Sequence, residues 1–373
     1  MLTHSDVARA LEELSEAKRL LSTRGKTNWG AQDGVMLKTC LAPFVNLKYE
    51  EAFLVLEDKD LIFFGEACLT LELYNECNFL LRLFIDKTKE SDDNKGRVWV
   101  MVGTALQNLH RNEEAEVAYR KAVGLDEKLA EGWCKLGELL MDMKRYSRAD
   151  PAFRKALEAN PNLIQAILGL GNVNANLGKY SEAERNFLEV INKQLDLKVE
   201  ASHSEVSEAY FGLGLIYEHG NKIKDAIEYY LKVLEADGRH IDALNRLGIL
   251  YEKENRLLEA ESSFKRIIEL DENNANALNN VGLFYKNYGK LDKAEELYRR
   301  ALTNDPSHVL AWSNLGVLLL IQNRKKEALN AFDTAVGLDP NNAFAKSNLD
   351  FLRGLTQNRI ANAKGEKIRK RVY

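Results

Sequence analysis

The sequence predicts an all-α solenoid, a fold in which similar helix pairs stack one after another in a long array. Three observations predict it. Glycines recur at intervals of 34 residues, apolar residues recur at helical spacing within each interval, and only 5 of the 373 residues are proline. A helix pair of this size cannot bury its apolar face alone, so similar pairs must stack to form a continuous core.

The period defines seven repeats. With each recurring glycine placed at position 8 of its repeat, position 20 is alanine in every repeat, from Ala115 to Ala328, and position 24 is always Phe or Tyr, from Tyr119 to Phe332. An offset of 43 residues separates the third glycine from the fourth, so nine extra residues lie between the third and fourth repeats. The glycines are Gly103, Gly137, Gly171, Gly214, Gly248, Gly282 and Gly316.

Each repeat is expected to hold two amphipathic helices, A and B. Positions 4, 7, 8 and 11 share one helical face, and positions 20, 24 and 27 share another. Small residues at positions 8 and 20 let the two backbones approach closely, with the bulky residues at positions 4 and 24 on either side of that contact. Position 15 is Gly or Asn in five repeats, which predicts a left-handed residue just after helix A. These five are Gly178, Asn221, Asn255, Gly289 and Asn323.

The repeats resemble a known family. Blocks such as Ala311-Trp312-Ser313-Asn314-Leu315-Gly316, followed by Glu327-Ala328-Leu329-Asn330-Ala331-Phe332, are similar to the tetratricopeptide repeat (TPR), and the resemblance covers residues 96–342. It implies a right-handed α-solenoid of helix-turn-helix units with the A helices along its concave face. It also implies a non-catalytic protein-binding function.

The N-terminal part is less regular. Residues 1–57 form a helical region of either divergent TPR-like repeats or a separate cap, with helices expected over 5–21, from about 33, and over 48–56, and a loop over 22–33. Residues 58–95 are read as a degenerate repeat, because Gly65, Cys77 and Leu81 occupy positions 8, 20 and 24.

The remaining segments complete the predicted organisation. Residues 96–197 hold repeats one to three and residues 207–342 hold repeats four to seven. The insertion at 198–206 either lengthens a helix or forms a loop, and we expect a break between two repeat blocks there. Residues 343–361 resemble one more helix A, a C-terminal cap with a polar outer face. Residues 362–373 are basic and expected to be disordered.

Composition excludes several classes of protein. The formal net charge of −4 gives no excess of basic residues, so we expect no nucleic-acid binding. No run of 18 apolar residues and no secretory signal is visible, so we expect no membrane insertion. The four cysteines lack disulfide or metal spacing, which favours a reduced, cytoplasmic protein. The basic tail is either a nuclear-import or anionic docking signal, or a solvated terminus.

No catalytic, metal or cofactor motif is complete. Arg24-Gly25-Lys26-Thr27 resembles the end of a phosphate-binding loop, but Leu20 stands where that motif needs glycine. The six histidines have no metal-ligand spacing, and His110, His240 and His308 are expected at helix ends. We therefore expect no enzyme activity and no cofactor.

The family resemblance implies that positions 2, 5, 6, 9, 12 and 13 point into the concave groove. Asparagines recur there, and an amide both donates and accepts, so a ladder of them suits the backbone of an extended peptide. Position 9 supplies an apolar strip formed by Leu215, Ile249, Leu283, Val317 and Phe351. The candidate peptide-binding residues are Asn245, Arg246, Asn279, Asn280, Asn314, Asn348, Asn172, Asn176 and Phe211.

Two features qualify this groove. Gly169 and Gly212 at position 6 either open a notch in it or are ordinary variation. The carboxylate clamp of chaperone-tail receptors in this family is incomplete here, because only Asn172 and Arg246 fit it.

The predicted function is a scaffold or adaptor that binds an extended peptide or a partner helix. One alternative is self-assembly into a homo-oligomer, with contacts from an aromatic-rich start formed by Phe44, Tyr49, Phe53, Phe63 and Phe64, unless these residues form a buried core. The other is recruitment of substrates to a multiprotein enzyme complex.

Overall fold

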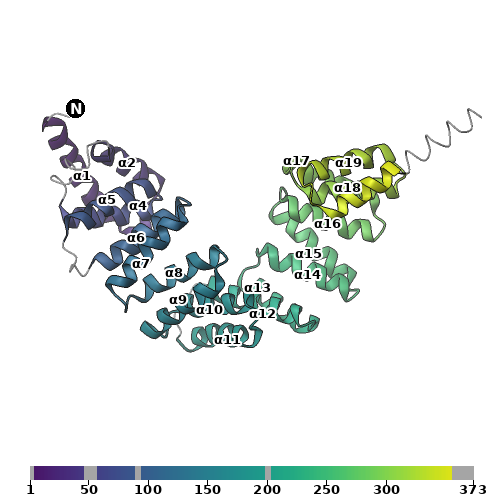
Figure 1. Ribbon diagram of the computed structural model, residues 1–373, viewed down its shortest axis with the longest axis horizontal. Coiled ribbons are helices and arrows are strands. Elements are labelled where there is room, and N and C mark those ends of the chain that lie inside the picture. Colours follow the sequence, from purple (N-terminus) through teal and green to yellow (C-terminus); the bar gives the residue numbers. More distant parts are fainter. Residues whose placement is uncertain (1–3, 46–56, 89–93, 198–202, 355–373) are drawn as a thin grey trace, which may run out of the picture. The chain divides into compact units, whose positions relative to one another are not determined.

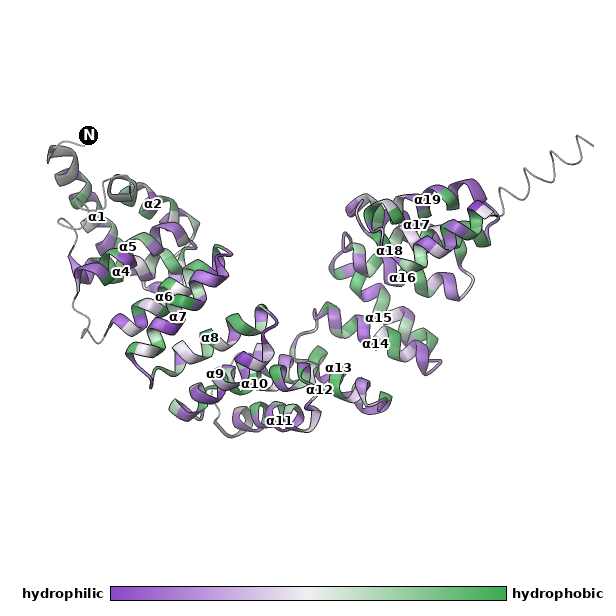
Figure 2. Cartoon of the chain, in the orientation of Figure 1, coloured by the Kyte–Doolittle hydropathy of each residue, from purple (hydrophilic) through white to green (hydrophobic). Residues whose placement is uncertain are grey.

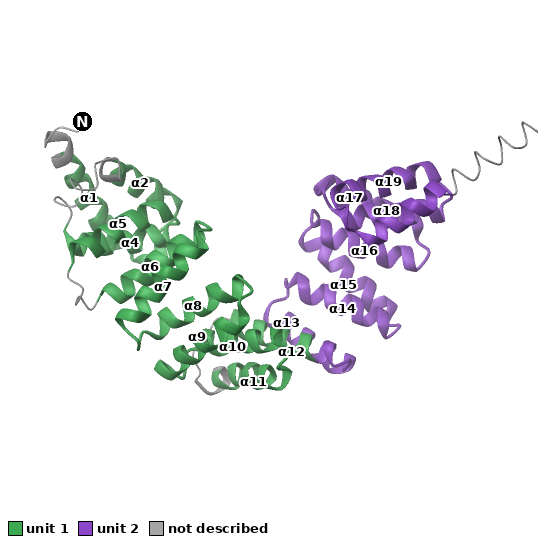
Figure 3. Cartoon of the chain, viewed as in Figure 1, with its two compact units in different colours: residues 1–216 green, residues 217–373 purple. Residues whose placement is uncertain are grey.

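The computed structural model describes residues 4–45, 57–88, 94–197 and 203–354 (Figure 1). Within these ranges the regular structure is helical, with no strand, and the helices follow one another as stacked antiparallel pairs. The expected all-α solenoid is therefore confirmed. The backbone contacts divide the chain into two units, residues 1–216 and 217–373 (Figure 3), and the boundary lies within one helix, after the inserted residues.

Unit 1 begins with two helices and a short 3-10 turn, followed by A and B helices in alternation. The expected helix over 5–21 lies within α1, and the expected loop over 22–33 is shorter because α2 begins at Ala31. The elements are α1 His4–Arg24, η1 Lys26–Asn28, α2 Ala31–Val45, α4 Asp58–Thr70, α5 Tyr74–Lys87, α6 Lys95–Asn108, α7 Asn112–Leu125, α8 Ala130–Asp142, α9 Tyr146–Ala159, α10 Ile164–Asn176, α11 Tyr180–Leu197 and α12 His203–His219, which continues into unit 2.

Unit 2 continues the alternation. After α19, residues 343–354 are helical and occupy the place of one more helix A. The expected helix over 48–56 and the tail 362–373 lie outside the described residues. The helices of unit 2 are α13 Ile223–Ala236, α14 Ile241–Lys253, α15 Leu257–Leu270, α16 Ala275–Asn287, α17 Leu291–Asn304, α18 Val309–Ile321 and α19 Lys325–Leu338.

The inserted residues lengthen the helices on both sides of them. α11 has 18 residues and α12 has 17, against 14 in α9 and 13 in α8. Residues 198–202, between the two long helices, lie outside the described part of the chain.

One contact recurs between the two helices of six repeats, the first to third and the fifth to seventh. The ring at position 24 of helix B lies directly on the glycine at position 8 of helix A, so a Cβ on Gly282 would sit 2.8 Å from Tyr298 and one on Gly316 2.8 Å from Phe332. Tyr298 and Phe332 are fully buried. We expected the ring beside the close backbone contact; it instead occupies the space that the missing Cβ leaves.

In unit 1 the same rings also reach the next pair. Phe153 lies against Gly137 of its own repeat and Gly169 of the following one, and Phe187 lies against Gly171 and Gly212. The proposed notch at Gly169 and Gly212 is therefore wrong, because the phenylalanine rings of the preceding repeats fill that space. The two glycines are buried packing positions.

The turn after each helix A is left-handed at position 15, as expected. Asn221, Asn255 and Asn323 have φ of 55–60°, and Gly178 and Gly289 have φ of 74° and 71°. Glu72, His110 and Lys144 adopt the same conformation, which their residue type did not indicate.

Apolar and polar residues lie on different sides of many of the helices. Figure 2 shows hydrophobic and hydrophilic residues sharing single helices in both units. The side chains at the start of α14, α16 and α18 also cap those helices. His240, Asn274 and His308 accept hydrogen bonds from the backbone N–H of Ala243, Ala277 and Ala311.

We predict that Gly282→Ala lowers the free energy of unfolding. The added methyl group would meet the Tyr298 ring, and overpacking of about 1–3 kcal/mol outweighs the roughly 1 kcal/mol that alanine gains in a helix. The matched control is Gly337→Ala in α19, where a Cβ meets nothing within 4 Å, so stability rises by up to about 1 kcal/mol. Urea unfolding of the full chain measures both, and equal effects of the two substitutions would contradict this packing.

Candidate functional site

The candidate site is the exposed side of the A helices, formed by positions 2, 5, 6, 9, 12 and 13, which we call the A-helix face. Side chains on this face join successive A helices within each unit. Six of the predicted site residues lie in unit 2, and Asn172, Asn176 and Phe211 lie in unit 1.

Four asparagines of unit 2 form a hydrogen-bonded ladder across three helices. Asn280 Nδ2 donates to Asn245 Oδ1 at 3.2 Å, and Asn314 Nδ2 donates to Asn279 Oδ1 at 2.9 Å. Within α16, Asn279 Nδ2 donates to Asn280 Oδ1 at 3.3 Å. The amide at position 6 of one repeat thus bonds the amide at position 5 of the repeat before it, and the ladder ties α14, α16 and α18 together.

The ladder differs from the expected row of independent amides. Asn279 is only 4% exposed and serves the ladder itself, whereas Asn245, Asn280 and Asn314 are half-buried. A primary amide has two N–H donors and an oxygen that accepts two bonds, so one inter-repeat bond does not exhaust it. The three half-buried amides can still offer groups to a ligand.

Arg246 and Asn348 lie on the same face outside the ladder. Arg246 Nη1 pairs with Glu218 Oε1 at 3.3 Å, and the Tyr230 hydroxyl donates to Glu218 Oε2 at 2.9 Å. Burial and this hydrogen bond raise the pKa of Tyr230. Asn348 Nδ2 donates to the Phe344 carbonyl of its own helix at 2.8 Å.

In unit 1 the three predicted residues form a smaller group on α10 and α12. Asn172 Nδ2 donates to Glu208 Oε1 at 3.0 Å, and Asn176 Nδ2 donates to the Asn172 carbonyl at 2.8 Å. Phe211 is half-buried on α12. Each of these two amides thus donates one hydrogen bond within the chain.

Apolar side chains lie beside the ladder on α16, α18 and the helical residues 343–354. The position 9 residues Leu283 and Val317 are half-buried, and Phe351 is 62% exposed. The neighbouring residues at positions 2 and 13 are not among the predicted site residues, although the same repeat frame places them on this face. Four of these side chains are more than half exposed, and we call them the apolar row: Leu310, Ile321, Phe344 and Phe351.

The B-helix side carries a different periodic feature, also missed from the sequence. Glu116 pairs with Arg145 at 2.7 Å, Glu261 with Lys290 at 3.4 Å, and Glu295 with Arg324 at 2.7 Å. Each pair spans 29 residues and joins position 21 of one repeat to position 16 of the next. The sequence signal for these ion pairs is an acidic residue followed 29 residues later by a basic one, at the same positions in several repeats.

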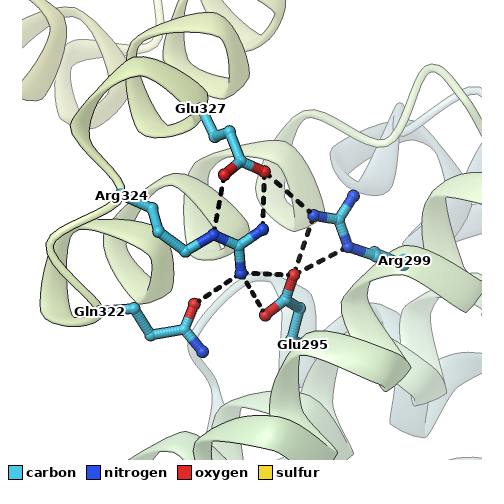
Figure 4. Close-up of polar contacts among 5 residues, drawn as sticks. All are labelled: Glu295, Arg299, Gln322, Arg324 and Glu327. Atoms are coloured by element: carbon cyan, nitrogen blue, oxygen red, sulfur yellow. Dashed lines mark hydrogen bonds and ion pairs between the residues drawn. The ribbon is translucent and has the colours of Figure 1, made fainter.

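The pair at the end of unit 2 belongs to a network (Figure 4). Arg324 also binds Glu327 at 2.6 Å and Gln322 at 2.9 Å, and Arg299 binds Glu295 at 2.8 Å. The pKa of Glu295 is below its ordinary value. Burial acts to raise this pKa, but the hydrogen bonds from Arg324, Arg299 and Gln322 together lower it by more. This network ties α17 to the start of α19.

The described residues contain no group of three or more His, Cys, Asp or Glu side chains that could hold a metal ion. Burial raises the pKa of the Cys68, Cys77 and Cys134 thiols, which suits packing positions. His240 and His308 are the helix caps described above. Among the helices of the described part, we find none with the length and apolarity of a membrane span.

Protein-family models described as tetratricopeptide repeat match most of residues 96–343. The matched segments are 96–129, 130–163, 168–241, 221–277, 263–296 and 287–343. A search of curated protein sequences found no match.

Two solved structures, with TM-scores of 0.50 and 0.54, have the same fold. The Pseudomonas aeruginosa protein pilF is 21% identical over 60% of this chain and 97% of its own, with a TM-score of 0.50. A chain of the APC/C hetero-tetramer Cut9-Hcn1 is 15% identical over 86% and 72%, with a TM-score of 0.54. YrrB, described as a TPR protein with an unusual peptide-binding site, is 26% identical over 52% and 95%, with a TM-score of 0.39.

We predict that Glu295→Gln destabilises the protein at neutral pH by about 1 kcal/mol, because it removes the charge that binds Arg324 and Arg299. Since the pKa of Glu295 is lowered in the folded state, its contribution is complete above the ordinary carboxyl pKa of about 4.3 and is lost as the pH falls through the folded-state value. Thermal unfolding at pH 7 and near pH 3 measures the difference. A gap between wild type and variant that persists at acid pH would contradict this account.

Proposed function

This chain belongs to the tetratricopeptide repeat family, whose arrays act in general as non-catalytic protein-interaction scaffolds, and we propose that the A-helix face of unit 2 binds an extended peptide or a partner helix. In the family this face lines the concave groove. The observation that carries the proposal is the placement of half-buried amides and exposed apolar side chains on the same helices. Asn314, Leu310 and Ile321 all belong to α18.

The two kinds of side chain suit a polypeptide ligand. Amides bond peptide N–H and C=O groups without regard to side chains, and the apolar row gives the ligand's apolar side chains a surface to bury. Isolated apolar side chains on a surface need no explanation, but four that are 54–62% exposed on adjacent A-type helices favour an interaction site. The ladder also stiffens the face, which lowers the ordering entropy of binding.

The free thiols of the cysteines favour a reducing compartment. All four are free, and Cys68, Cys77 and Cys134 are buried among apolar neighbours. A reducing environment suits such thiols, so we place the binding in the cytoplasm, with the nucleus as the alternative if the basic tail acts as an import signal.

Self-association is a second candidate function, and the exposed rings of Phe344 and Phe351 on the terminal helix favour it. Of the aromatic residues near the start, Phe64 is buried and Phe63 packs half-buried against Trp29, so these two do not favour it. The side chains of Phe44, Tyr49 and Phe53 lie outside the described part of the chain. Light scattering on the full chain separates the two functions. A concentration-dependent dimer that Phe344→Ser with Phe351→Ser converts to monomer supports self-association.

We predict that Leu310→Ser with Phe351→Ser weakens peptide binding at least tenfold, because burial of a large apolar side chain contributes about 1.5–3 kcal/mol. The probes are peptides that the full chain selects from a displayed library of random dodecapeptides. The melting temperature should change little, since both side chains are more than half exposed.

The matched control is Leu258→Ser, at a residue that is 82% exposed on the B helix α15. It should leave the affinity for the selected peptides unchanged. Loss of binding in the control, or unchanged binding in the double variant, would place the site elsewhere.

A further inference from the structure

At two places in the array, the side chain at position 12 of one helix A bonds to the side chain at position 13 of the next helix A. Gln107 Nε2 donates to Asp142 Oδ2 at 3.0 Å in unit 1, and Asn287 Nδ2 donates to Glu252 Oε1 at 3.2 Å in unit 2. Glu218, at position 12 of the fourth repeat, instead pairs with Arg246 at position 6 of the next. In all three cases the partner lies on the following helix A.

Lys286 occupies position 12 of the sixth repeat, where this pattern fails. The residue at position 13 of the following helix A is Ile321, an apolar side chain that is 56% exposed. Asn314 on the same helix bonds to Asn279. Among the described residues, no carboxylate lies within 4.0 Å of the Lys286 ammonium, although Glu218 and Glu252, at position 12 of the two preceding repeats, both have partners.

The surroundings of Lys286 disfavour its charge. The side chain is half-buried, and burial lowers its pKa with no carboxylate to oppose the shift. Folding has already removed part of the water around this ammonium. A carboxylate from a ligand can therefore pair with the ammonium without paying that part of its desolvation again on binding.

The location links this charge to the proposed peptide site. Lys286 lies on α16 one helical turn after Leu283, and the next helix A presents Val317 and Ile321. A ligand segment that covers the apolar row therefore passes beside the ammonium. The surface combines apolar contacts with one cation that lacks a counter-charge within the described chain.

Resting on the proposed function, we propose that the bound segment is an acidic-apolar one, in which an Asp or Glu side chain pairs with Lys286 beside an apolar residue that contacts Ile321. The incomplete clamp discussed above uses positions 2, 5, 6 and 9, so this charge at position 12 is a separate determinant. It selects among peptides, whereas the asparagine ladder does not.

The test uses the full chain and dodecapeptides displayed between two linkers, so that only side-chain carboxylates are available. Wild-type protein should enrich Asp or Glu next to an apolar residue. Lys286→Met, which keeps a long unbranched side chain, should weaken the selected peptides about tenfold, and Lys286→Glu should enrich Lys or Arg at the same place. Lys326→Met on the exposed side of α19 is the matched control and should change neither affinity nor selection.

Synthetic versions of a selected peptide complete the test. Replacing its acidic residue with the matching amide should weaken binding to wild type about tenfold and leave binding to Lys286→Met unchanged. Amidation of its C-terminus should have no effect; a large effect would assign the carboxylate to a chain terminus and overturn the side-chain assignment.

The remaining outcomes separate this inference from the proposed function. If Leu310→Ser with Phe351→Ser abolishes binding but neither Lys286 variant changes affinity or selection, the peptide site stands and the acidic determinant is wrong. If no peptide is selected, or the double variant binds normally, the proposed function fails and this inference fails with it. A lower melting temperature of Lys286→Met would show that the charge is paired within the chain, and would also overturn it.

Discussion

The rest of the structure depends on the contact between an aromatic ring at position 24 and the bare backbone of a glycine at position 8. Because the ring occupies the volume of a missing Cβ, the two helices of a pair have one close separation and one register. The same contact recurs in six of the seven repeats, from Gly103 with Tyr119 to Gly316 with Phe332. Identical pairs then stack so that equivalent positions of successive A helices lie next to each other, as the bonds from Asn280 to Asn245 and from Asn314 to Asn279 show in unit 2.

Two sets of polar contacts reinforce the stack from opposite sides. The asparagine ladder joins the A helices, and the ion pairs from position 21 to position 16 join the B helices. Neither set reaches Lys286 or the exposed ends of Leu310 and Ile321. The side chains that fold the array and those that remain available for a partner are thus interleaved on one face. Residues that stabilise the fold and residues available to a partner thus occupy different positions of the same repeats, not different regions of the chain.

The fold could be predicted from the sequence because its determinants are local and periodic. The glycine at position 8, the aromatic at position 24 and the left-handed residue at position 15 all recur in the printed letters. The site could be predicted only in outline, because its chemistry depends on contacts between repeats. The sequence does not show that Asn279 is buried in the ladder or that Phe153 fills the space at Gly169. Nor does it show that Lys286 has no carboxylate within 4.0 Å among the described residues. His110 and Lys144 likewise adopt a left-handed conformation that the repeat, not the residue type, imposes.

Hydrogen–deuterium exchange of the full chain with and without a selected dodecapeptide tests most directly whether recognition belongs to the A helices of unit 2. The account predicts slower amide exchange in α14, α16 and α18 on binding, with α13, α15, α17 and α19 little changed. Slower exchange confined to the B helices, or to unit 1, would contradict it.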